Sequence, residues 1–164
     1  MTHRWAVRVL LLMVMIFSLG LASATTASAK KKNSVIATLN GKRFKWKGRF
    51  VLASYSGNGT IIVAAKPGKV IRTIGFGCPI YPPNETFPLS PPAQYCNANY
   101  TETTGRRHPI IKGWLKLSDV QVTYESFDGD RLTGSFSATL DPVPGNDLPP
   151  VTVAGTFNTK ATPR

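Results

Sequence analysis

Strict alternation of apolar and polar residues limits this chain to a narrow range of folds. The longest example spans residues 132–140, where Leu132, Phe136 and Leu140 alternate with serine and threonine. Successive side chains of a β-strand point to opposite faces, so this period of two predicts strands with one packed and one solvated face. Similar short runs recur after residue 33, separated by glycine, proline and asparagine turns, and no long run has helical periodicity. We therefore expect an all-β fold, an antiparallel β-sandwich or small barrel of about eight to ten short strands.

The first 29 residues have the organisation of a secretory signal peptide. Arg4 and Arg8 precede an apolar run from Val9 to Leu21, and Ala27-Ser28-Ala29 forms a small-x-small cleavage site. The run is shorter than the ~20 residues of a membrane span, and an uncleaved anchor is the alternative interpretation. No cysteine marks a bacterial lipoprotein site. These features predict a secreted or periplasmic bacterial protein with a single β domain at residues 30–164.

The expected mature chain is strongly basic. The sequence has 20 lysines and arginines and 8 acidic residues, and removal of Arg4 and Arg8 leaves 18 against 8, a net charge of +10. Such a charge attracts anionic surfaces and polymers, although it could also serve solubility alone. Export would exclude cytosolic nucleic acid as a partner, and no transmembrane span is expected in the mature protein.

Two cysteines border a proline-rich segment. Cys78 and Cys96 enclose most of residues 77–96, where six of the 13 prolines lie, so this segment is expected to be an irregular loop. An even pair of cysteines in an exported protein predicts a disulfide. A redox pair usually has closer spacing, and a zinc site needs more ligands than the single histidine of the mature chain, His108, supplies.

A run of alternating cations is the strongest candidate for a binding site. We expect Arg43, Lys45, Lys47 and Arg49 to share one strand face at a spacing of ~7 Å, with Lys42 beside them. Phe44, Trp46 and Phe50 would then point into the core. This pattern suits contact with an extended polyanion, and the alternative is an edge strand that its charge protects from pairing with other strands.

Other candidate sites are weaker. Arg106, Arg107 and His108 form a secondary anion-binding candidate, and His108 is the only residue around which a hydrolytic enzyme could be built. No catalytic residue is assigned, and no cofactor is expected. The acidic residues Asp119, Glu125, Asp128 and Asp130 are expected to cluster near one hairpin. They favour turn chemistry over a metal site, with Asp128 and Asp130 as weak candidate ligands.

Three tyrosines lie in or near the proline-rich loop. Tyr81, Tyr95 and Tyr100 could form a ligand-contacting surface, but packing of the loop onto the sheets is the favoured interpretation.

The region from Gly113 to Phe157 resembles small exported bacterial β-sandwich proteins of unknown function. The matching residues follow the patterns Val120-x-Val122-x-Tyr124, Asp128-Gly129-Asp130-x-Leu132-x-Gly134-x-Phe136-x-Ala138 and Val153-x-Gly155-x-Phe157. The opening Asn40-Gly41-x-x-Phe44 is also similar. The resemblance implies a β-sandwich and assigns no activity or site.

These observations favour a non-catalytic binding or structural protein of the cell envelope that contacts an anionic surface or polymer. A small barrel that carries an apolar ligand is the main alternative, since about eight strands can enclose one small molecule.

Overall fold

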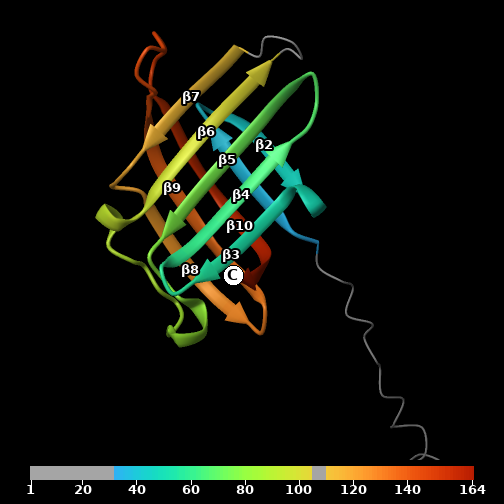
Figure 1. Cartoon of the computed structure of the whole chain (residues 1–164), viewed down its shortest axis with the longest axis vertical. Coiled ribbons are helices and arrows are strands. Elements are labelled where there is room, and N and C mark those ends of the chain that lie inside the picture. Colours follow the sequence, from blue (N-terminus) through green and yellow to red (C-terminus); the bar gives the residue numbers. More distant parts are fainter. Residues whose placement is uncertain (1–31, 105–109) are drawn as a thin grey trace, which may run out of the picture. The chain divides into compact units, whose positions relative to one another are not determined.

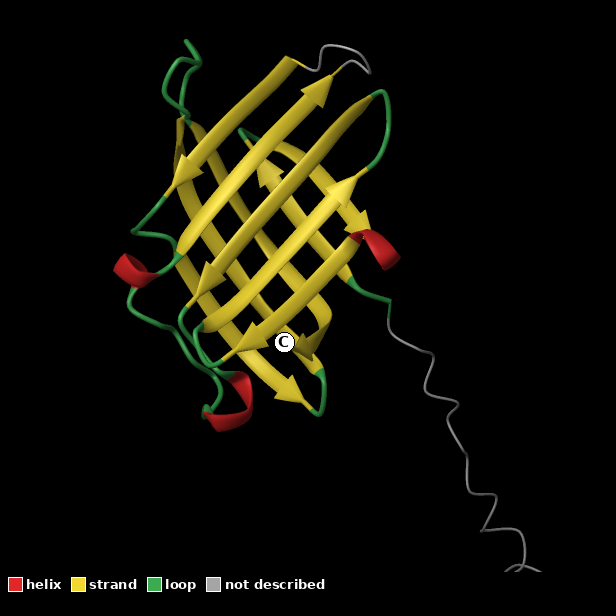
Figure 2. Cartoon of the chain, viewed as in Figure 1, coloured by secondary structure: helices red, strands yellow, loops and turns green. Residues whose placement is uncertain are grey.

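The computed structural model describes residues 32–104 and 110–164, and these residues confirm the all-β prediction (Figure 2). The predicted signal peptide lies outside the described residues. Within the described ranges there are ten strands and three 3₁₀ turns, which are β1 (Ser34–Leu39), β2 (Lys42–Lys47), η1 (Gly48–Phe50), β3 (Val51–Ser56), β4 (Gly59–Lys66), β5 (Val70–Cys78), η2 (Pro82–Asn84), η3 (Ala93–Tyr95), β6 (Asn97–Thr104), β7 (Ile110–Lys116), β8 (Gln121–Asp128), β9 (Arg131–Pro142) and β10 (Val151–Pro163).

The strands form two layers, which lie one behind the other in Figure 1. Sheet A has the order β8-β9-β10-β1-β2, and sheet B has the order β3-β4-β5-β6-β7. The two long strands join the layers, because the end of β9 pairs with β7 and the end of β10 pairs with β3. In the described part of the chain the pairing thus closes a cycle through β10, β3, β4, β5, β6, β7 and β9.

One pairing differs from the expected antiparallel arrangement. The final residues of β10, Ala161 to Pro163, pair in parallel with Ala53 to Tyr55 of β3. The strand is long enough to continue past its partner β1 and to reach the edge of sheet B. The strand pairing is therefore mixed, parallel between β10 and β3 and antiparallel elsewhere among the described strands. The sequence could not indicate this, because parallel and antiparallel strands show the same alternation of side chains.

Aromatic side chains fill the space between the layers. The ring of Phe76 in sheet B stacks on that of Phe136 in sheet A, with centroids 4.3 Å apart, and lies 5.3 Å from the ring of Phe157. Trp46 is 1% exposed, and its indole Nε1 donates a hydrogen bond to the Arg72 carbonyl across the layers at 3.1 Å. These contacts bury large apolar surfaces, which is the main source of stability in such a fold.

The similar triplets Gly134-Ser135-Phe136 and Gly155-Thr156-Phe157 lie on neighbouring strands in reversed register. Gly134 pairs with Phe157, and Gly155 pairs with Phe136. A Cβ atom added at Gly134 would lie 2.5 Å from the Phe157 ring and 2.1 Å from the Thr123 carbonyl oxygen. Gly134 therefore leaves room for the ring of its cross-strand partner. A Cβ atom at Gly155 would instead meet the Ile36 carbonyl oxygen and Ala37 of β1.

Two strand boundaries are visible in the sequence, one before the basic run and one near Asp119. Asn40 and Gly41 both have positive φ, 45° and 81°, which produces the expected tight hairpin between β1 and β2. The apolar/polar alternation changes phase near Ser118-Asp119, which predicts a β-bulge or a bend. The chain bends at Leu117 and Ser118, between β7 in sheet B and β8 in sheet A, so the bend is confirmed. A register shift does occur later, between Tyr124 and Ser126 of β8.

The cysteine pair lies where the sequence predicts a disulfide. The two sulfur atoms are 2.10 Å apart, and they join the end of β5 to the residue before β6. The intervening loop follows the outer edge of β8, where Leu89 exchanges two backbone hydrogen bonds with Tyr124. Among the described residues no helix is long and apolar enough to span a membrane.

Candidate anion-binding edge of sheet A

The basic run forms an exposed edge of sheet A. Strand β2 hydrogen-bonds to β1 on one side, and no other described strand pairs with it. Arg43, Lys45 and Lys47 are exposed and alternate with half-buried Phe44 and buried Trp46. The alternation expected for the run is therefore confirmed between residues 42 and 47, and the run lies at a sheet edge, as the alternative interpretation proposed. We call residues 42–49 the basic edge.

The end of the basic edge differs from the expectation. The strand ends at Lys47, because Gly48 adopts a φ of 69° and begins the 3₁₀ turn η1. Arg49 therefore leaves the strand face and lies over the ring of Phe50, with its guanidinium carbon 4.9 Å from the ring centroid. Phe50 is 38% exposed and is not a core residue.

Positive charge at the basic edge is not neutralised within the described residues. The three ion pairs found there are Arg72–Glu102, Lys116–Asp141 and Lys160–Asp130, and none includes a cation of the basic edge. The charge of Lys47, with a smaller contribution from Arg43, lowers the pKa of the Lys45 ammonium group from its ordinary value. An approaching anion would relieve this repulsion.

A polar network lies where the basic edge meets sheet B. Glu102 accepts hydrogen bonds from the Tyr100 hydroxyl at 2.6 Å and from Arg72 Nε at 2.9 Å. The Arg72 guanidinium and the Lys42 ammonium group both lie over the Phe44 ring, 5.5 and 5.8 Å from its centroid. A surface hollow of about 260 Å³ opens here. Its lining mixes aromatic rings with both signs of charge, so it does not form a purely anionic or cationic site.

Glu102 should make the free energy of unfolding depend on pH in the acid range. Partial burial opposes ionisation, but the hydrogen bonds from Tyr100 and Arg72 outweigh burial and lower the pKa of the Glu102 carboxyl from its ordinary 4.5. A lowered folded-state pKa stabilises the fold above pH 4.5, and the stabilisation is lost as the pH falls through that lower value. In thermal unfolding between pH 7 and pH 3, Glu102→Gln should therefore lose less stability than the unmodified protein. An equal difference between the two proteins at every pH would contradict this assignment.

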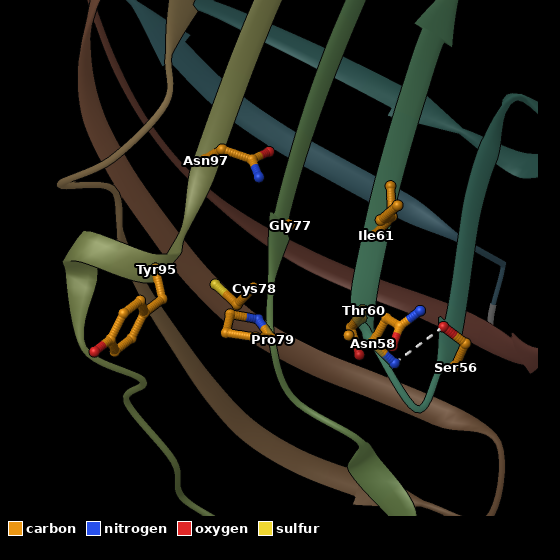
Figure 3. A pocket seen from close by; sticks show the side chains of 10 residues that line it. Ser56, Asn58, Thr60, Ile61, Gly77, Cys78, Pro79, Tyr95 and Asn97 are labelled. Atoms are coloured by element: carbon orange, nitrogen blue, oxygen red, sulfur yellow. Dashed lines mark hydrogen bonds between the residues drawn. The ribbon is translucent and has the colours of Figure 1, made fainter.

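A second hollow lies beside the disulfide (Figure 3). It has a volume of about 220 Å³, and its lining includes the amides of Asn58 and Asn97 and the ring of Tyr95, which is 59% exposed. The three tyrosines do not form the shared surface considered above, because Tyr100 is buried against Trp114. Tyr81 packs edge-on against Tyr55 at 5.5 Å, so the prediction that the loop packs onto the sheets is confirmed for this residue.

The remaining candidates do not assemble into a site within the described residues. Asp128 and Asp130 lie at the β8–β9 hairpin as predicted, whereas Asp119 precedes β8 at its other end, so its predicted place in the acidic cluster is wrong. Asp130 forms an ion pair with Lys160. No group of three potential metal ligands occurs in the described ranges. Arg106, Arg107 and His108 lie outside the described residues.

Sequence reasoning missed a polar surface that continues from the basic edge. On the outer face of sheet A, most side chains of β8, β9, β10 and β1 are hydroxyls or amides. The signal was visible as serine and threonine at alternate positions, as in Thr133, Ser135 and Ser137. Its position beside the basic edge depends on pairing between β1 and β10, which lie far apart in the sequence.

Comparisons with protein-family models, with curated proteins and with solved structures find no match for this chain. The basic edge and the polar face beside it are therefore the features from which a function can be inferred.

Proposed function

We propose that this is an exported, non-catalytic protein of the bacterial cell envelope that binds an anionic polymer or surface through the basic edge. The observation that carries the proposal is the array of exposed cations on β2, which has no carboxylate partner among the described residues. The expected net charge of +10 in the mature chain would add long-range attraction.

A strand presents charges differently from a flexible basic tail. Hydrogen bonds to β1 hold the backbone of Arg43, Lys45 and Lys47, and alternate residues of a strand are ~7 Å apart. Contact with a polyanion would release its condensed counterions, so binding should weaken linearly with the logarithm of the salt concentration. The same charges protect the open edge against pairing with other strands, and the two roles are compatible.

A carrier of apolar ligands is less well supported. It would need room between the layers, where the described aromatic rings of Phe76, Phe136 and Phe157 pack against one another. The proposed binding function needs no interior cavity.

The test compares two variants with the same change in net charge. Lys45→Glu/Lys47→Glu alters the basic edge, and Lys69→Glu/Arg164→Glu alters exposed cations in the β4–β5 turn and after β10. Binding to inorganic polyphosphate is measured over a salt series, and the logarithm of the binding constant is plotted against the logarithm of the salt concentration. Because the first variant loses two contacts, we expect its slope to be smaller in magnitude by about 1.4–1.8. The second variant should keep the original slope. Equal losses in both variants would show that only net charge matters, and the proposal would then be wrong.

A further inference from the structure

We infer that the outer face of sheet A extends the basic edge into a binding surface for an anionic polysaccharide. This inference rests on the proposed function and names the ligand class of the same site. The side chains involved carry hydroxyl or amide groups and form what we call the hydroxyl face: Ser34, Thr38, Gln121, Thr123, Ser126, Thr133, Ser135, Ser137, Thr156 and Asn158.

The pairing register arranges these residues in rows that each begin at a cation. One row runs from Lys45 through Ile36, Thr156 and Ser135 to Thr123. The row on one side begins at Arg43 and reaches Ser137 and Gln121, and the row on the other side begins at Lys47 and reaches Thr133 and Ser126. Neighbouring strands are ~4.8 Å apart, so the β9 position of each row lies about 14 Å from the basic edge.

A hollow lies at the far end of two of these rows. It has a volume of about 300 Å³, and its polar lining comes from Gln121, Thr123, Ser135 and Ser137. The proline-rich loop borders this region, because the Ser90 hydroxyl lies 3.0 Å from that of Thr123. The hydroxyl face is therefore hollowed where the Arg43 and Lys45 rows approach β8.

The distribution of charge separates two kinds of contact. Strand β2 carries exposed cations of the basic edge. Outside β2, the cations on the strands of sheet A are Arg131 of β9 and Lys160 of β10, which lie at the β8–β9 hairpin end beside Asp128 and Asp130. The exposed Glu125 lies on β8 at the side of the sheet opposite β2. An anionic group would be attracted to the basic edge and repelled from the β8 side. The hollow therefore suits the uncharged hydroxyl groups of the same ligand, which serine and threonine can meet as both donors and acceptors.

The composition of the face favours a polysaccharide over a single-stranded nucleic acid. The exposed large apolar and aromatic side chains of the described residues all lie outside the strands of sheet A. Bases would therefore find no aromatic stacking platform on the hydroxyl face. Since about 14 Å separate the cations from the β9 hydroxyls, one sugar unit cannot contact both, and an oligosaccharide is required.

The test uses oligogalacturonate as an anionic sugar chain and inorganic polyphosphate as an anionic chain without sugar hydroxyls. In calorimetric titrations we expect Ser135→Ala/Ser137→Ala to weaken oligogalacturonate binding about tenfold, since each lost hydrogen bond contributes on the order of 1 kcal/mol. Polyphosphate binding should not change. Monomeric galacturonate should bind far more weakly than the oligomer.

A matched control removes hydroxyls from the other sheet. Thr73 and Thr101 are cross-strand neighbours on the outer face of sheet B, and Thr73→Ala/Thr101→Ala should leave both titrations unchanged. Ser137→Ala alone, at an exposed position, should weaken oligogalacturonate binding about threefold and guards against misfolding of the double variant.

Two outcomes have different meanings. If the serine variants bind oligogalacturonate as the unmodified protein does, or if they lose polyphosphate binding equally, the polysaccharide inference is overturned while the basic edge stands. If Lys45→Glu/Lys47→Glu leaves the binding of both polymers unchanged, the proposed function itself fails.

Discussion

Replacement of Gly134 with alanine should lower the free energy of unfolding by about 3 kcal/mol or more. A Cβ atom at this position would lie 2.1 Å from the backbone oxygen of Thr123 and 2.5 Å from the Phe157 ring. The ring could rotate, but the carbonyl belongs to the paired strand β8 and can move only with the sheet. Chemical denaturation monitored by circular dichroism measures the loss.

The matched control is Gly57→Ala. Nothing lies within 4 Å of a Cβ atom added at Gly57, which is exposed in the turn between β3 and β4. Alanine there should change stability by less than about 0.5 kcal/mol. If Gly134→Ala were as harmless as this control, the close packing of β8, β9 and β10 described above would be incorrect.

Removal of the disulfide should destabilise the protein by about 3 kcal/mol, since a cross-link that closes a loop of this size restricts the unfolded chain. Cys78 and Cys96 are separated by 18 positions, and the loop between them contributes Leu89 as a partner of β8. For a domain of this length, Cys78→Ser/Cys96→Ser should lower the melting temperature by roughly 10 °C.

Reductant provides the control for this prediction. The unmodified protein should melt at a lower temperature after reduction, and the double serine variant should be insensitive to reductant. A variant that melts at the temperature of the oxidised protein would indicate that the loop is held by its packing alone.

Local patterns predicted the secondary structure well because they depend on neighbouring residues. The alternation of residues 132–140 lies within β9, and Asn40-Gly41 forms the expected hairpin. The strand containing the basic run was placed correctly as far as Lys47. The prediction that the strand continues to Arg49 was wrong because Gly48 turns the chain. Glycine adopts negative and positive φ with similar ease, so its presence in the sequence did not show that the strand ends there.

Long-range features of the site could not be predicted in the same way. Whether Lys45 lies in one row with Thr156 depends on two successive pairings, from β2 to β1 and from β1 to β10. The prediction that Asp119 lies with the other acidic residues near 119–130 was wrong for a related reason. They are close in sequence, but an extended strand of eight residues separates Asp119 from Asp128 in space.

The position of β10 has a consequence for the order in which the chain can fold. This strand pairs with β1, β9 and β3, and Val35 of β1 pairs with Phe157, which lies far along the chain. A growing chain therefore cannot complete sheet A, or join it to β3, until residues 151–163 have been made, and folding that depends on such distant contacts is slow. In the proposed exported protein, this delay would keep the chain unfolded during the interval in which a translocation channel must thread it.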